Sequence, residues 1–79
     1  MSNNLEIRVR NVFVDTFSIE ESLVVDSLAY SSIPQWDSVA HMSLIVNLED
    51  EFDIMIDTDD VIDMSTFQKS VEIVEKYLD

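Results

Sequence analysis

Residues 36–52 read WDSVAHMSLIVNLEDEF, and this stretch decides the fold. Asp37 is a residue type preferred as a helix N-cap, because its carboxylate accepts hydrogen bonds from free backbone N–H groups. We therefore expect a helix over residues 38–52. Its apolar residues recur at helical spacing, which predicts a face that is apolar except at one glutamate. The residues at this spacing are Val39, Met42, Ile45, Val46, Glu49 and Phe52.

Three further segments are predicted to be helical. An apolar stripe indicates a helix over residues 3–16, and a short helix over 58–63 carries acids in its first turn, where the helix dipole favours them. A last helix is expected over residues 66–78, with Ser65 as its N-cap because Gln68 follows at capping-box spacing. The first stripe comprises Leu5, Val9, Val12, Phe13 and Thr16, and the last comprises Phe67, Val71, Val74 and Leu78.

Residues 17–36 form a long predicted loop with a short helical turn near 20–25. Apolar residues are scattered along this loop, so we expect it to pack on the core. Together these elements predict an all-α fold, a four-helix bundle with three main helices, a short third helix and a long first loop. We expect residues 1–79 to form a single domain.

The composition excludes several classes of protein. The 79 residues include no cysteine and no glycine, which excludes disulfide frameworks, cysteine–zinc sites, P-loops and dinucleotide-binding loops. Acids outnumber Lys and Arg by 17 to 4, giving a net charge of −13. Such a polyanion repels nucleic acid and anionic lipid and attracts basic protein surfaces. With no signal-peptide pattern and no membrane-spanning run, we expect a cytoplasmic monomer without nucleic-acid or membrane partners.

Ser38 is the residue best suited to carry a modification. As the first residue of the predicted helix, it places its hydroxyl at the positive end of the helix dipole, beside free backbone N–H groups. A phosphate ester is electrostatically favoured at that position. Asp-Ser is also a common way to begin a helix, so the pair alone is a weak indication of function.

Over essentially the whole chain, the sequence resembles the acyl carrier protein family. The family's Asp-Ser-Leu attachment motif corresponds to Asp37-Ser38-Val39, and its Leu-Glu-x-x-Phe block corresponds to residues 48–52. The resemblance implies a carrier and not an enzyme. It implies that a phosphopantetheinyl transferase moves 4′-phosphopantetheine from coenzyme A to Ser38. The thiol of this arm would then hold acyl groups as thioesters for fatty-acid, polyketide or specialised biosynthesis.

A second Asp-Ser pair, in Asp26-Ser27-Leu28, matches the attachment motif more literally. It lies in the predicted loop, and Pro34 separates it from the following amphipathic helix. It is also about three helical turns farther from the Leu-Glu block. We therefore prefer Ser38, and we interpret Ser27 as part of a turn that places Leu28 in the core.

The resemblance also implies partner enzymes that load and process the acyl group through basic patches. Charge complementarity of this kind speeds encounter more than it tightens binding. The candidate partner-binding residues are Val39, Met42, Glu49, Asp50, Glu51, Asp59, Asp60 and Asp63. Each acid could equally be a solubilising surface residue. The stretch after Ser38 is neutral, whereas acids are common there in fatty-acid-synthesis members, so the choice of partners could differ.

A serine hydrolase using Ser38, His41 and Asp37 is excluded, because one helical turn cannot orient a base through a third group or form an oxyanion hole. No metal site is expected, since the acids from residue 57 onward lack the EF-hand pattern. Two alternatives stay open. One is a peptidyl or aminoacyl carrier with the same arm, and the other is an acidic helical interaction module whose Ser38 is never modified.

Several neighbouring residues have more than one interpretation. His41, one turn after Ser38, either contacts the arm's phosphate or Asp37, or is a packing histidine, and we prefer the second. Trp36 is interpreted as a hydrophobic plug beneath the loop. Flexible methionines permit repacking around an acyl chain. Those expected in the core or lining a subpocket are Met42, Met55 and Met64.

Overall fold

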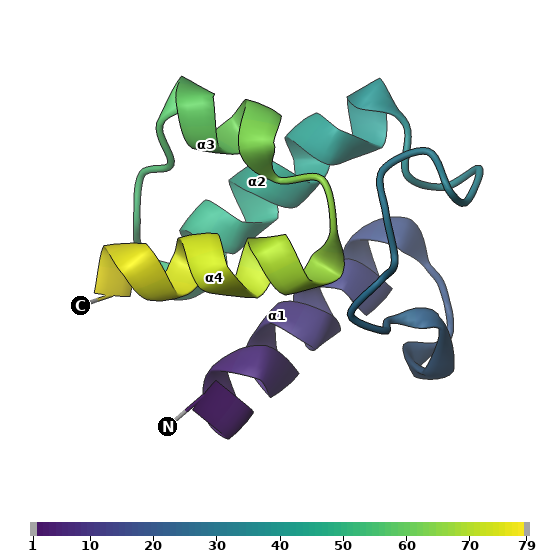
Figure 1. Cartoon of the computed structure of the whole chain (residues 1–79), viewed down its shortest axis with the longest axis horizontal. Coiled ribbons are helices and arrows are strands. Elements are labelled where there is room, and N and C mark those ends of the chain that lie inside the picture. The colour runs from purple at the N-terminus through teal and green to yellow at the C-terminus, as the bar shows by residue number, and fades with distance from the viewer. Residues whose placement is uncertain (1, 79) are drawn as a thin grey trace.

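The computed structural model describes residues 2–78 of the chain, and it is all-α within that range (Figure 1). The helices are α1 (Ser2–Phe17), the 3-10 turn η1 (Glu21–Leu23), α2 (Ser38–Phe52), α3 (Thr58–Asp63) and α4 (Phe67–Leu78). The predicted fold class is therefore confirmed, and the boundaries of the four predicted helices lie within one residue of those observed. The short turn expected near 20–25 corresponds to η1. None of the helices described has the length and apolar character needed to cross a membrane.

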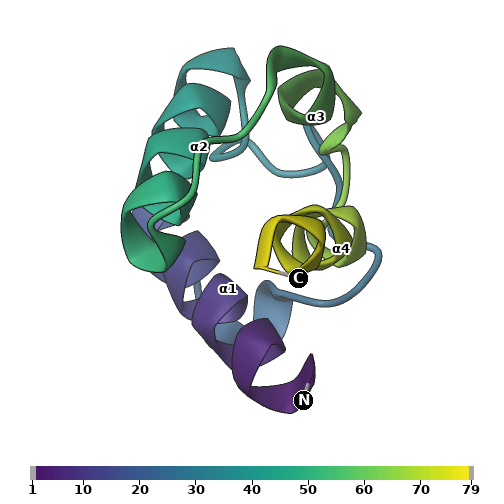
Figure 2. The ribbon, with the colours of Figure 1, turned by 90° about the vertical axis from the view of Figure 1, so that its left-hand side faces the viewer.

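The helices surround a core with Phe13 at its centre. α1 packs against both α2 and α4, and α3 lies on the opposite side, between α2 and α4 (Figure 2). The Phe13 ring meets Phe17, Trp36 and Phe67 edge-to-face, at centroid distances of 5.5, 5.2 and 5.1 Å. Such pairs add to the stabilisation that burial alone provides. Trp36 has no exposed surface, so its predicted role as a plug beneath the loop is confirmed.

The face that α2 buries agrees with the predicted one only in part, since Ile45 and Phe52 are buried as expected. Val39, Met42 and Val46 belong to the predicted stripe but are 76%, 55% and 57% exposed. The buried residues of α2 are Leu44, Ile45, Leu48 and Phe52. The cause is that α2 is apolar on more than one face, so two sets of residues satisfy helical spacing. Packing against α1 selects one set and leaves the other in solvent.

The buried face of α4 is predicted only in part. Phe67 and Val74 are buried as expected, whereas Leu78 is exposed. Ile73 and Ser70 occupy buried positions that the predicted stripe does not include. Burial of Ser70 is tolerated because its hydroxyl donates to a backbone carbonyl one turn earlier, at 2.9 Å.

Thr66 caps α4, and the prediction of Ser65 as the cap is wrong. The backbone N–H of Lys69 donates to the Thr66 hydroxyl oxygen at 3.0 Å. Ser65 belongs to extended chain, because its carbonyl accepts the N–H of Tyr30 (2.9 Å) beside an isolated β-bridge between Ala29 and Thr66. The helix therefore begins one residue later than the capping-box pattern indicates.

The long loop is anchored on the start of α4. The N–H groups of Phe67 and Gln68 donate to the carbonyl oxygens of Leu28 and Asp26, at 2.8 and 3.3 Å. These bonds satisfy donors that have no partner within the helix. Buried apolar residues of the loop are Ile19, Val24 and Leu28, whereas Leu23 and Val25 are exposed. The loop therefore packs on the core as expected. The exceptions are Leu23 and Val25, whose side chains are exposed to solvent.

Candidate functional site

Ser38 opens α2 and is exposed to solvent. The preceding Asp37 is the N-cap, as predicted, because its Oδ1 accepts the N–H of Ala40 at 2.9 Å. The Asp37 carbonyl accepts the N–H of His41 at 2.8 Å, which starts the helical hydrogen bonds. The Ser38 hydroxyl therefore lies at the positive end of a 15-residue helix, where an added phosphate ester would be stabilised.

Removing the Asp37 cap should weaken this helix start. Asp37→Ala is expected to lower the free energy of unfolding by about 1 kcal/mol, because the Ala40 N–H loses its acceptor. Asp37→Asn is the matched control, since its amide oxygen still accepts that bond without the negative charge. Urea denaturation followed by circular dichroism measures both variants. Equal stability of Asp37→Ala and the starting protein would contradict the capping role.

A cavity of about 380 Å³ opens beside Ser38. Ser38 and Met42 of α2 line it together with Val61 and Ile62 of α3, and the buried Met64 also contributes to the wall. Apolar side chains thus form most of the wall. The placement of Met42 and Met64 around a subpocket agrees with the prediction.

Met55 is expected in the core or the subpocket, and this expectation is wrong. Its side chain is 84% exposed on the connection between α2 and α3, outside the cavity. Tyr30, Val61 and Ile62 also line the cavity, and the sequence pattern does not predict this for any of them. For Val61 and Ile62 the signal in the sequence is that they are the apolar pair of a short, otherwise polar helix.

His41 is half-buried on the wall of the cavity. Its Nδ1 accepts the indole N–H of Trp36 at 2.9 Å, and its Nε2 lies 2.9 Å from the carbonyl oxygen of Val61 on α3. Because an indole nitrogen only donates, Nδ1 carries no hydrogen and Nε2 donates its proton to Val61. Both ring nitrogens are engaged, and neither bonds the Asp37 carboxylate. This geometry agrees with the preferred interpretation of His41 as a packing histidine.

The acids near the end of α2 have different surroundings. Glu49 is half-buried, and its Oε2 accepts the N–H of Ile56 at 2.9 Å, which fixes the chain that leads to α3. Glu51 pairs with Arg8 of α1 at 3.0 Å. Asp50 is exposed and forms no ion pair with another described residue. Among these three acids, Asp50 is therefore the most available to a partner.

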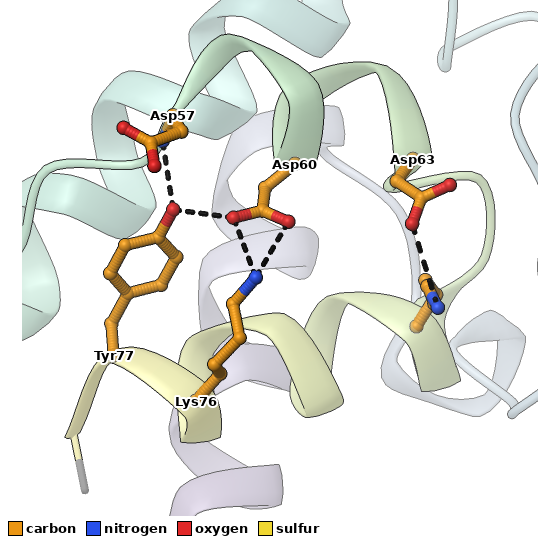
Figure 3. Close-up of polar contacts among 6 residues, drawn as sticks. Asp57, Asp60, Asp63, Lys76 and Tyr77 are labelled. Carbon is orange, nitrogen blue, oxygen red and sulfur yellow. Dashed lines mark hydrogen bonds and ion pairs between the residues drawn. The ribbon is translucent and has the colours of Figure 1, made fainter.

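A polar network joins α3 to α4 (Figure 3). Both oxygens of Asp60 accept from Lys76 Nζ at 2.8 Å, and one also accepts from the Tyr77 hydroxyl. That hydroxyl in turn accepts the N–H of Asp57 at 2.9 Å. The hydrogen bond from Lys76, followed by that from Tyr77, lowers the pKa of Asp60. The bond to the Asp60 carboxylate raises the pKa of Lys76 and that of Tyr77.

The other α3 acids are less constrained. Asp63 lies 3.7 Å from Lys69 and keeps 67% of its side chain exposed, whereas only 14% of the Asp60 side chain is exposed. Asp59 is exposed and has no ion pair within residues 2–78. The predicted partner-binding residues that remain exposed and unpaired in this part of the chain are Val39, Met42, Asp50 and Asp59.

The Asp60 network should make stability depend on acid pH. Because the pKa of Asp60 is lower in the folded chain, its contribution is fully present above the ordinary value of 3.8 and is lost as the pH falls through the lowered value. Asp60→Asn should lower Tm at neutral pH, and the difference should shrink as the pH falls below 3.8. Asp59→Asn is the control, since it removes the same charge from the same helix without breaking a bond. Parallel Tm profiles of the two variants would exclude this role of the network.

The sequence of the chain is similar to that of known proteins over nearly its whole length. No protein-family model matches the chain. Two similar proteins are named acyl carrier protein, from Buchnera aphidicola subsp. Acyrthosiphon pisum strains Tuc7 and APS. Each is 27% identical over 73 residues, which cover 92% of this chain and 91% of the relative. The resemblance to acyl carrier proteins is thereby confirmed. Acyl carrier proteins, as their name says, carry acyl groups, and the likeness spans nearly the whole chain.

Proposed function

We propose that this chain is an acyl carrier whose Ser38 bears a 4′-phosphopantetheine arm, delivered from coenzyme A by a phosphopantetheinyl transferase. The thiol of the arm would hold the acyl group as a thioester. The observation that carries the proposal is the position of Ser38, an exposed hydroxyl at a helix N-terminus on the rim of an apolar cavity. The likeness to relatives named acyl carrier protein supports it.

The residues around Ser38 fit such an arm. A helix start has several N–H groups without intrahelical acceptors, and Asp37 occupies only that of Ala40, so donors remain for a phosphate. Met42 and Met64 line the adjacent cavity with flexible side chains that can repack around an acyl chain. The chain has no cysteine, so a thiol for thioester chemistry has to come from the arm.

Partner enzymes, in this proposal, dock on the exposed side of α2 that follows Ser38. Val39 and Met42 offer apolar contact there, and the exposed acids Asp50 and Asp59 attract basic patches. Glu49, Glu51, Asp60 and Asp63 add to the overall negative potential, although each also has an intramolecular partner. A cytoplasmic monomer, folded as one domain over residues 1–79, suits such an exchange among several enzymes.

Intact-mass spectrometry tests the proposal. The purified protein is incubated with coenzyme A, magnesium and a promiscuous phosphopantetheinyl transferase. We expect a mass gain of one phosphopantetheinyl group, and no gain when coenzyme A is omitted. Circular dichroism of the same sample confirms that the protein is folded. No gain in a folded sample, tested with several transferases, would instead favour an acidic interaction module whose Ser38 stays unmodified.

A further inference from the structure

His41 lies between the cavity beside Ser38 and the buried ring of Trp36. Its ring lines the cavity, whereas Trp36 has no exposed surface and does not line it. The two rings are stacked, with centroids 6.0 Å apart and planes inclined by 22°. Behind them, Trp36 packs on Phe13 and Phe17 at 5.2 and 5.4 Å. A chain that enters the cavity and continues toward Trp36 therefore meets the imidazole first.

The same ring also ties three segments together. Through Nδ1 it holds the Trp36 indole in the loop, and through Nε2 it holds the Val61 carbonyl on α3. α3 is a six-residue helix with no fully buried side chain, and the bond from His41 joins it directly to α2. Moving the ring aside would leave the buried indole N–H and the carbonyl without partners, which is unfavourable.

We propose that His41 is the residue that limits the length of the acyl chain this protein shelters. The inference rests on the proposed function of Ser38 as the attachment site. Short aliphatic chains occupy the cavity with His41 in place. Longer chains enter the space toward Trp36 only by displacing the ring, which breaks both of its hydrogen bonds and loosens α3. His41 thus limits the chain directly, and its hydrogen bonds to Trp36 and Val61 hold the ring in place.

Trp36 provides a direct readout, because it is the only tryptophan in the chain and its indole N–H bonds to His41. The protein is loaded at Ser38 from butanoyl-, octanoyl- or hexadecanoyl-coenzyme A, and solvent exchange of the indole proton is followed by NMR. The butanoyl form should exchange as slowly as the unacylated form. The hexadecanoyl form should exchange at least about tenfold faster, since its chain breaks the indole hydrogen bond.

Two variants test whether His41 acts as a gate, meaning a residue that limits the length of the sheltered acyl chain, or only supports the fold. His41→Gln keeps an acceptor for Trp36 and a donor for Val61, so the dependence of exchange on chain length should persist. His41→Ala removes both, so exchange should be fast for every chain and no longer depend on length. If His41→Ala does not fold, the starting protein and His41→Gln still decide the matter.

The outcomes of this experiment also separate the two proposals. Intact mass is recorded before each NMR measurement, so failure to load at Ser38 would contradict the proposed carrier function itself. Equal indole exchange in the butanoyl and hexadecanoyl forms of a fully loaded protein would overturn the gate and leave the carrier function standing. A length dependence that survives in His41→Ala would overturn it as well.

Discussion

Ser38→Ala should abolish loading by the transferase while leaving the free energy of unfolding within about 0.5 kcal/mol of the starting protein. The hydroxyl of Ser38 is exposed and has no hydrogen-bond partner among the described residues, so the fold does not depend on it. Loading does depend on it, because the phosphodiester needs that oxygen. Intact mass after incubation with coenzyme A, magnesium and the transferase measures the first effect, and urea denaturation measures the second.

Ser27→Ala is the matched control for this variant. Asp26-Ser27-Leu28 is the more literal copy of the attachment motif, and Ser27 is also exposed. Its surroundings differ, because Leu28 is buried and the Asp26 carbonyl accepts the N–H of Gln68. Ser27 therefore lies in a loop that is anchored to the start of α4, and not at the start of a helix. We expect Ser27→Ala to load fully, and loading that survives in Ser38→Ala but fails in Ser27→Ala would overturn the assignment.

Local signals in the sequence predict the helices and the start of α2 well. The Asp37 cap and the helix after it involve residues within one turn of each other, which a sequence pattern records directly. The buried face of α2 is predicted only in part, because Val39, Met42 and Val46 fit helical spacing as well as the buried set does. Only the position of α1 decides between the two faces, and that position is a long-range property.

In the candidate site, too, local features can be predicted from the sequence and long-range contacts cannot. Ser38 and its cap can be predicted from neighbouring residues, whereas the cavity needs α3 to lie beside α2. The hydrogen bond from His41 to Val61 spans 20 residues, and the pairing of Lys76 with Asp60 spans 16. A count of acids cannot show that Asp60 is held by α4 while Asp59 is exposed. Only the three-dimensional structure therefore shows which acids are free to contact a partner protein.

Phe13→Ala is expected to have the largest effect on stability, lowering the free energy of unfolding by about 3–5 kcal/mol. Phe13 has no exposed surface, and its ring meets three other aromatic rings from α1, the loop and α4. A domain of this size has little stability to lose, since small proteins lie toward the lower end of about 5–15 kcal/mol. The variant should therefore be largely unfolded at low salt.

The stability of Phe13→Ala should also depend on the salt concentration. With a net charge of −13, the chain repels itself in the folded state, and added salt screens that repulsion. Raising the salt concentration should therefore restore part of the helical circular dichroism signal of Phe13→Ala. Ile7→Ala is the control on the same helix, because Ile7 is 49% exposed and its loss should cost less than about 1 kcal/mol. If the two variants lost equal stability in urea titrations, Phe13 could not be the centre of the core.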